Sequence, residues 1–198
     1  GIAGLQGSGK STLARQLGDG GQAQGLGVTA LSRDDFYLGP RERQRLARTV
    51  HPLLATRGPP GTHDVALACA TLDALRNLAD GSAITLPSFD KARDRRLPPA
   101  RWPRVTRRPD LIVFEGWCLG VPPEAADALP TPVNALERDE DPDGRWRRHV
   151  NAALALYAPL WCRIDRLLFL QGPGFEVVPA WRAEAQATPA GAPPALDI

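Results

Sequence analysis

The sequence predicts an α/β fold, a three-layer α/β/α sandwich with a mainly parallel central sheet. Segments with the pattern of strands alternate with segments with the pattern of helices, which is typical of parallel sheets joined by crossover helices. A glycine-rich motif at residues 4–12 stands between the first strand and the first helix. Two apolar runs, at residues 28–32 and 111–114, end close to carboxylates. In open parallel sheets, ligands bind at the carboxyl ends of the strands.

Local composition predicts strands and helices in the first part of the chain, up to the helix after Asp64. Apolar residues precede the glycine-rich motif, and helix-compatible residues follow it. Glycines then crowd a segment that we expect to be a flexible turn. Asp64 is suited to cap a helix whose apolar residues recur at helical spacing. In order, we expect a strand at 2–3, a helix at 11–17, a turn at 18–27, a strand at 28–32, a basic helix at 41–48, a loop at 51–61 and the helix after Asp64.

The second part contains two further buried strands. Residues 111–114 form a continuous apolar run, which is expected of a strand buried on both faces, and residues 167–170 have the same character. Proline-rich stretches at 98–109 and 122–132 are expected to be loops around the site. The remaining expected elements are a strand at 83–86, a helix at 146–160 and a helix at about 175–187.

Length and composition restrict the class of protein. The chain has 198 residues, of which 43% are apolar, enough for one core. The formal net charge of +2 is too small to indicate a nucleic-acid partner, and no apolar run reaches the roughly 18 residues of a membrane span. Three cysteines without a C-x-x-C pair favour a reducing compartment, so we expect a cytoplasmic protein. We also expect a monomer or weak homodimer. Methionine is absent, and we expect the native chain to contain residues that this sequence lacks.

Residues 4–12 match the phosphate-loop pattern G-x-x-x-x-G-K-[ST] at every fixed position. Glycines allow successive backbone N–H groups to turn around a phosphate, and the following helix adds its dipole. Lys10 is expected to reach the β- and γ-phosphates of ATP, and the hydroxyl of Ser11 is expected to ligate Mg²⁺. The nucleotide-binding candidates are Gly4, Gln6, Gly7, Ser8, Gly9, Lys10, Ser11 and Thr12.

Two strands are expected to present carboxylates near the phosphates. Asp34 and Asp35 follow the strand at 28–32 and precede Tyr37. One of them is expected to accept the proton of an attacking hydroxyl while the other caps or orients the turn, and Asp34 is preferred for the catalytic role. Glu115 ends the apolar run at 111–114, where an acid is suited to hold Mg²⁺ directly or through water. A structural turn is the alternative for each acid.

Three polar segments are candidates for the acceptor side. Asp64, next to His63, can accept hydrogen bonds from substrate hydroxyls as well as cap a helix. Residues 91–96 contain four cations, which suit a carboxylate or a phosphate. Residues 145–149 are basic, as in a lid that closes over a transferring phosphoryl group. A solvated surface is the alternative for both charged segments. The substrate-side candidates are Asp34, Tyr37, His63, Asp64, Asp90, Lys91 and Arg93.

Seven segments form a recognisable set: GSGKST, LSRDDFYL, HPLLATRGPPGTHD, LPSFDKARDRR, FEGWCLG, PVNALE and WRRHVN. Over residues 1–182 they resemble the P-loop kinases of the D-glycerate 3-kinase type from plants and fungi, with their bacterial relatives. That family belongs to a wider group with uridine kinase, phosphoribulokinase and bacterial pantothenate kinase. The chain departs from uridine kinases at PGTHD, and it lacks the last segment of the family, which often contains a Tyr-Glu-Arg cluster.

The resemblance implies a single P-loop kinase domain over residues 1–198, with a substrate-side insertion at about 38–108 and a lid at about 138–150. It implies ATP-dependent phosphorylation of a small hydroxylated metabolite, most closely D-glycerate, with Mg²⁺ as the metal. The catalytic set that it implies is Lys10, Asp34, Glu115 and Arg148, with Ser11 and Glu115 near the metal. If the acceptor is an anionic hydroxy acid, a cation within residues 91–96 is expected to bind its carboxylate.

Two other functions remain open on the sequence alone. A kinase of another small molecule, such as a nucleoside, pantothenate or a sugar, would use the same phosphate loop. A nucleotide-dependent switch would need a guanine-reading N-K-x-D element, which is absent, although residues 141–144 fit D-x-x-G. No basic stripe with interleaved aromatic residues indicates a nucleic-acid substrate.

Overall fold

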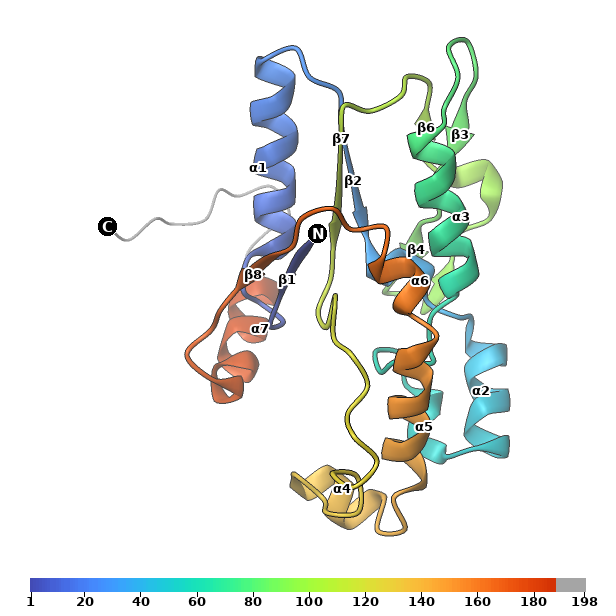
Figure 1. Ribbon diagram of the computed structural model, residues 1–198, viewed down its shortest axis with the longest axis vertical. Helices are drawn as coiled ribbons and strands as arrows, with labels where there is room; N and C mark the ends of the chain where they lie inside the picture. Colours follow the sequence, from blue (N-terminus) through green and yellow to red (C-terminus); the bar gives the residue numbers. More distant parts are fainter. Residues whose placement is uncertain (188–198) are drawn as a thin grey trace.

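In the computed structural model, which describes residues 1–187, a parallel sheet of four strands forms the centre. The strands lie in the order β2 (Val28–Ser32), β7 (Leu111–Glu115), β1 (Ile2–Gly4) and β8 (Leu168–Leu170), as Figure 1 shows. Every pairing within this sheet is parallel. The phosphate loop therefore follows a strand in the interior of the sheet.

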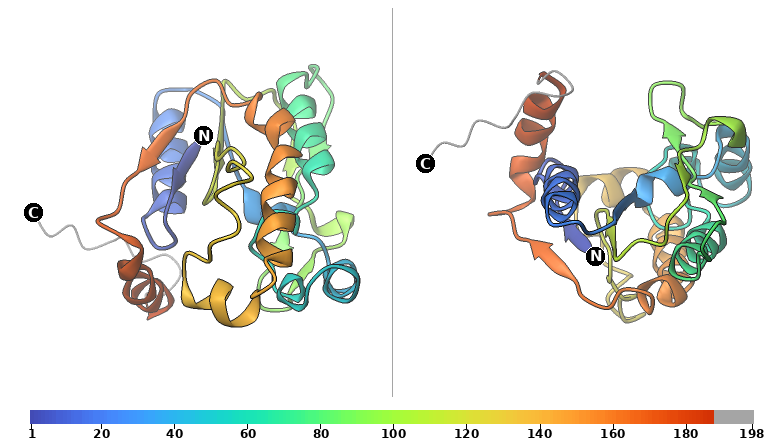
Figure 2. Two further views of the ribbon diagram at one scale, coloured as in Figure 1. Left: turned by 60° about the horizontal axis from the view of Figure 1, so that its bottom comes forward. Right: turned by 90° about the horizontal axis from the view of Figure 1, so that it is seen from above.

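Helices cover both faces of the sheet. Helix α1 (Lys10–Ala23) packs on one face, and α3 (Val65–Arg76) and α6 (Ala158–Trp161) lie on the other, as the view from above in Figure 2 shows. Side chains of β1 and β7 alternate between the two cores: Ile2 and Val113 pack with α1, whereas Ala3 and Phe114 pack with α3 and α6. This alternation follows from the two-residue period of a strand. The expected three-layer α/β/α sandwich is confirmed.

The chain between β2 and β7 forms a group of short elements beside edge strand β2 (Figure 1). Two small antiparallel pairs, β3 with β6 and β4 with β5, belong to it. The elements outside the central sheet and its flanking helices are η1 (Arg33–Phe36), α2 (Pro40–Thr49), η2 (Pro52–Ala55), β3 (Ile84–Thr85), β4 (Phe89–Asp90), β5 (Arg95–Arg96), η3 (Pro99–Arg101), β6 (Arg104–Val105), α4 (Ala135–Glu140), α5 (Arg145–Ala155), η4 (Phe175–Val177) and α7 (Val178–Ala187).

The flexible turn expected at residues 18–27 is mostly helix, because α1 continues to Ala23. Glycine at position 21 has a packing reason rather than a turning one. A Cβ atom there would lie 2.4 Å from Cγ2 of Val28, so the helix approaches β2 too closely for a side chain. The sequence pattern detected the glycines but not the close approach that requires one of them.

Two other expectations are corrected. The helix expected at 146–160 is broken into α5 and α6, because Pro159 cannot donate the amide hydrogen bond that would continue the helix after Ala155. The strand at 167–170 was expected to be buried on both faces. Instead β8 lies at the edge of the sheet, and the side chain of Phe169 is 60% exposed. Within residues 1–187, no helix is long and apolar enough to cross a membrane.

The larger core lies between the sheet and helices α3 and α6. Leu75 of α3 is fully buried there, whereas Leu156 is 70% exposed. We expect Leu75→Ala to lower the free energy of unfolding by about 2–5 kcal/mol, since it removes buried methyl groups and leaves a cavity. The matched variant Leu156→Ala should stay within about 0.5 kcal/mol of the parent. Urea denaturation measures both, and equal effects would contradict the assigned core.

Candidate active site

The phosphate loop joins β1 to α1, and α7 packs against one side of it. Gly7 has a positive φ of 84°, a conformation that favours glycine. A Cβ atom at this position would lie 2.5 Å from Cβ of Trp181 in α7, so the loop and this helix are in close contact. Glycine at position 7 therefore serves both the turn of the loop and its packing.

Lys10 begins α1 and is nearly buried, with 8% of its surface exposed. Its Nζ atom donates a hydrogen bond of 2.6 Å to the carbonyl oxygen of Leu5 within the loop. Burial lowers the pKa of Lys10, against the opposing effect of the carboxylates of Glu115 and Asp34. The hydroxyl of Ser8 is also buried and has no hydrogen-bond partner among residues 1–187. The loop thus places a cation at the amino end of α1, where the helix dipole also favours a phosphate.

Glu115 lies at the carboxyl end of β7 and is 7% exposed. The hydroxyl of Ser11 donates a hydrogen bond of 3.0 Å to Oε1 of Glu115. Hydroxyl and carboxylate oxygens are the ligands that Mg²⁺ accepts, usually one or two from the protein with the rest from water and phosphate. No group of three or more His, Cys, Asp or Glu side chains within residues 1–187 is arranged to hold a metal. The two oxygens therefore fit a magnesium ion shared with a nucleotide.

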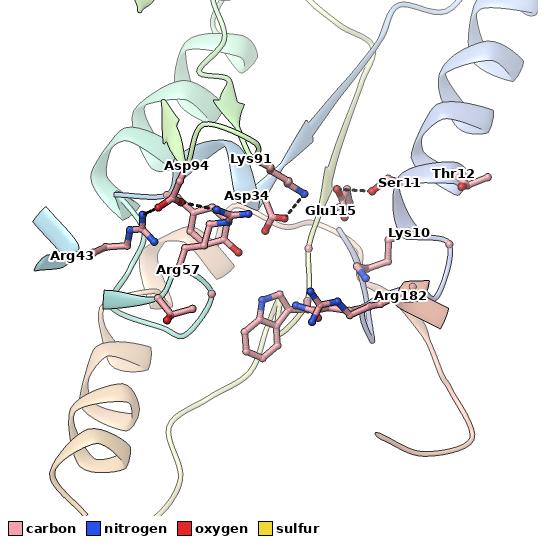
Figure 3. Close-up of a pocket in the computed structure, with 18 of the residues that line it drawn as sticks. Lys10, Ser11, Thr12, Asp34, Arg43, Arg57, Lys91, Asp94, Glu115 and Arg182 are labelled. Atoms are coloured by element: carbon pink, nitrogen blue, oxygen red, sulfur yellow. Dashed lines mark hydrogen bonds and ion pairs between the residues drawn. The ribbon is translucent and has the colours of Figure 1, made fainter. Parts of the chain in front are cut away.

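Asp34 lies in η1, directly after β2, and faces the phosphate loop (Figure 3). Its Oδ2 atom lies 2.7 Å from Nζ of Lys91, and the hydroxyl of Tyr37 also donates to the carboxylate. Burial alone would raise the pKa of Asp34, but the Lys91 ammonium and these hydrogen bonds outweigh burial and hold that pKa below its ordinary value. The carboxylate is therefore ionised at neutral pH and able to accept a proton.

Asp35 has a different environment from its neighbour Asp34. Its Oδ1 atom accepts a hydrogen bond of 3.0 Å from the backbone N–H of Phe89, which fixes β4 beside η1. Burial raises the pKa of Asp35, against the hydrogen bonds that it accepts. Asp35 does not line the cavity that contains Asp34. Asp34 therefore presents its partly buried carboxylate to the cavity, whereas Asp35 makes the contact that orients β4.

These groups surround one open cavity of about 850 Å³ at the carboxyl end of the sheet. Figure 3 shows that Lys10, Ser11, Asp34, Lys91 and Glu115 lie along it. Of the residues singled out from the sequence, those that line the cavity are Gln6, Gly7, Gly9, Lys10, Ser11, Thr12, Asp34, Tyr37, Lys91 and Glu115. Gly4 and Ser8 belong to the loop but do not line the cavity.

His63 lies behind the cavity wall. Its Nδ1 atom is 2.8 Å from the hydroxyl oxygen of Tyr157, and its ring centroid is 4.5 Å from that of Tyr37. Burial lowers the pKa of His63 well below its ordinary value, so the ring is neutral. The imidazole supports Tyr37, which itself lines the cavity.

Three other substrate-side candidates have partners outside the cavity. Asp64 caps α3 by accepting a hydrogen bond of 3.0 Å from the N–H of Leu67, and its other oxygen lies 3.4 Å from Nη1 of Arg96. Asp90 and Arg93 form an ion pair of 2.9 Å with each other. Neither Asp64, Asp90 nor Arg93 lines the cavity. Helix capping and a local ion pair account for their contacts.

The basic segment at 145–149 also lies away from the cavity. Arg147 is 7% exposed and donates to Oδ2 of Asp141 at 3.2 Å and to two backbone carbonyls of the loop before α4. Arg148 is exposed and donates to the carbonyl oxygen of Asp143. Asp141 itself accepts hydrogen bonds from the first N–H groups of α5. Arg147 thus ties the segment to its own loop, and Arg148 does not line the cavity.

Sequence reasoning missed several residues that line the cavity: Arg43, Arg57, Trp117 and Arg182. Asp94 also lines it and lies within the charged segment at 91–96, but it was not singled out as a residue. Arg57 stands in HPLLATRG, a segment noted for its resemblance but not for its cation. Arg182 follows Trp181, the residue that packs against the phosphate loop. Figure 3 shows Arg182 beside Lys10, on the nucleotide side of the cavity. The position of Arg182 depends on the packing of α7 against the phosphate loop, and no local sequence pattern encodes that contact.

No protein-family model matches the chain. The chain is 33% identical to the uncharacterized kinase mug58 of Schizosaccharomyces pombe, over 94% of this chain and 69% of that protein. It is 32% identical to the chloroplastic D-glycerate 3-kinase of Arabidopsis thaliana, over 94% of this chain and 40% of that protein. The solved structure of D-glycerate 3-kinase from Cryptococcus neoformans is similar with a TM-score of 0.71 and 28% identity, over 93% of this chain and 66% of that one.

The fold and the phosphate loop define a P-loop kinase. The chain belongs to the P-loop kinase family that contains the fission-yeast kinase mug58 and the D-glycerate 3-kinases. The resemblance noted from the seven sequence segments is therefore confirmed. The chain spans between 40% and 69% of the lengths of these three relatives.

The contact between Lys91 and Asp34 predicts a measurable pKa change. In Lys91→Met the burial of Asp34 remains but the neighbouring cation is lost, so the pKa of Asp34 should rise. The carboxyl titration can be followed by ¹³C NMR on aspartate-labelled protein, with Asp34→Asn to assign the signal. Arg95→Met, which removes an exposed cation of the same hairpin, should leave that pKa unchanged.

The same contact has a consequence for stability. Because the native pKa of Asp34 lies below that of the unfolded chain, ionised Asp34 stabilises the fold above about pH 4. This contribution is lost as the pH falls through the native pKa. A Lys91→Met protein in which Asp34 titrates at the same pH as in the parent would contradict the ion pair.

Proposed function

We propose that the protein is an ATP-dependent kinase that phosphorylates a hydroxyl of D-glycerate to give 3-phosphoglycerate. The observation that carries this proposal is the shared cavity, in which the phosphate loop, the Ser11–Glu115 pair and the carboxylate of Asp34 face one another. Relatives named D-glycerate 3-kinase support the choice of acceptor. The free cysteines among the described residues are compatible with the reducing cytoplasm as its compartment.

The proposed reaction uses these residues in separate roles. Backbone N–H groups of the loop and Lys10 hold the triphosphate, and Arg182 lies on the same side of the cavity. Asp34 accepts the proton of the acceptor hydroxyl as the hydroxyl oxygen attacks the γ-phosphorus in line, the bond from that phosphorus to the β–γ bridging oxygen breaks, and ADP leaves. The cations then stabilise charge on the equatorial oxygens. When bound, Mg²⁺ would be held by Ser11 and Glu115 and would neutralise phosphate charge.

The acceptor side of the cavity favours an anion over a neutral nucleoside or sugar. Arg43 and Arg57 line it together with the single carboxylate of Asp94, so cations are in excess there. A kinase of another small metabolite remains the second candidate, since the phosphate loop does not select an acceptor. The switch hypothesis loses its sequence support, because Asp141 of D-x-x-G is buried and caps α5 outside the cavity.

A substrate screen tests the proposed acceptor. Purified protein with Mg·ATP is offered D-glycerate, other short hydroxy acids, pantothenate, nucleosides and sugars, and the release of ADP is followed. We expect D-glycerate to give the highest kcat/KM. A higher kcat/KM for a nucleoside or a sugar would replace D-glycerate by that acceptor.

A single substitution tests the proposed base. We expect Asp34→Asn to lower kcat by about 10²–10⁴-fold, because the amide cannot accept the proton of the hydroxyl. ATP binding should be nearly unchanged, since Asp34 does not belong to the phosphate loop. Asp80→Asn, which changes an exposed carboxylate elsewhere, is the control. Unchanged turnover in Asp34→Asn would remove Asp34 from this role.

A further inference from the structure

One wall of the cavity contains a cation that neither the nucleotide nor the base requires. Arg57 follows η2 and lines the cavity opposite the phosphate loop, with Asp34 and Lys91 between them (Figure 3). Its side chain is 32% exposed. Only Nη1 of Arg57 has a hydrogen-bond partner among residues 1–187, so Nε and Nη2 keep free donors. These donors are available to a ligand in the cavity.

The position of Arg57 is fixed before any ligand arrives. Its Nη1 atom lies 2.6 Å from Oδ1 of Asp94, and its guanidinium lies 5.7 Å from the ring centroid of Phe89. The second oxygen of Asp94 is paired with Arg43, which is only 2% exposed. Asp94 adopts a positive φ of 51° in the turn between β4 and β5, a conformation in which few non-glycine residues are found. A buried arginine therefore anchors the carboxylate that holds Arg57.

The charges of this wall do not cancel. Two guanidinium groups share one carboxylate, so the cluster has an excess of one positive charge facing the cavity. An arginine fork matches the two oxygens of a carboxylate, and it is always protonated. An acceptor with its hydroxyl at Asp34 and its carboxylate at Arg57 would span the two sides of the site.

The other cations near the acceptor have partners that make them less suitable. Lys91 is paired with Asp34 at 2.7 Å, so its charge serves the base. Arg93 is paired with Asp90 outside the cavity. Arg96 donates to the carbonyl of Tyr37 at 3.1 Å and does not line the cavity. Sequence reasoning assigned the carboxylate to a cation within residues 91–96, whereas the contacts favour a residue of the preceding loop.

We propose that Arg57, held by Asp94 and Arg43, binds the carboxylate of the acceptor and thereby selects short hydroxy acids over neutral polyols. This inference rests on the proposed kinase function, whose acceptor class it defines. Arg57 would recognise the acceptor, whereas the phosphate loop would bind the nucleotide.

The test compares two acceptors that differ only in charge, D-glycerate and its neutral amide D-glyceramide. We expect Arg57→Gln to raise KM for D-glycerate by about 10–100-fold, since a charge-assisted pair is lost. KM for ATP and kcat/KM for the amide should change little. Arg57→Lys keeps the charge but not the fork, and it should recover part of the loss. Arg45→Gln is the matched control, because it removes an exposed arginine of α2.

The outcomes separate this inference from the proposed function. If the parent protein phosphorylates D-glycerate and Arg57→Gln keeps the full preference for acid over amide, the assignment of Arg57 is wrong and the kinase function stands. If the screen finds another hydroxy acid as the acceptor, the same comparison with its amide tests Arg57. If the best acceptor is neutral, the inference fails together with the choice of D-glycerate. An unchanged KM for ATP in Arg57→Gln shows that the variant is folded.

Discussion

The register of β7 between β1 and β2 is the constraint on which the site depends. Glu115 is paired with Ile2 on one side and with Ser32 on the other. The ends of β7 and β2 therefore lie at one level, and β1 continues past that level to Gly4, so the segments that follow the three strands reach the same edge. Shifting β7 by one residue would turn Glu115 toward the opposite face and separate it from Ser11. Sheet pairing, more than any local motif, brings the phosphate loop, Glu115 and Asp34 together.

Electrostatic balance explains why so many charged groups can coexist in the cavity. Carboxylates alternate with cations across it: Asp94 lies between Arg43 and Arg57, Asp34 beside Lys91, and Glu115 near Lys10. Fully buried Arg33 lies behind Asp34 and also lowers the pKa of that carboxyl. A pair of opposite charges costs less to bury than either charge alone. Entry of a triphosphate would add negative charge to a site that already holds its cations in place.

The sequence predicted the nucleotide side better than the acceptor side, for a physical reason. Lys10 and Ser11 begin the helix directly after one continuous loop, whose geometry is encoded by its glycines. Asp34 follows β2 and Glu115 ends β7, and parallel strands bring their ends together. Arg57 depends on contacts with side chains far along the chain, which no local pattern encodes. Arg147 shows the opposite case, since a basic helix start suggested a lid, whereas burial ties the residue to its own loop.

The contact between Gly7 and Trp181 links the position of α7 to the conformation of the phosphate loop. Because the backbone of α7 lies against the loop at Gly7, the loop could not widen at this point without displacing the helix. The shape of the loop thus depends on a segment more than 160 residues away along the chain. Arg182 belongs to the same helix, so a displacement of α7 would move this cation out of the cavity and remove the packing against the phosphate loop together.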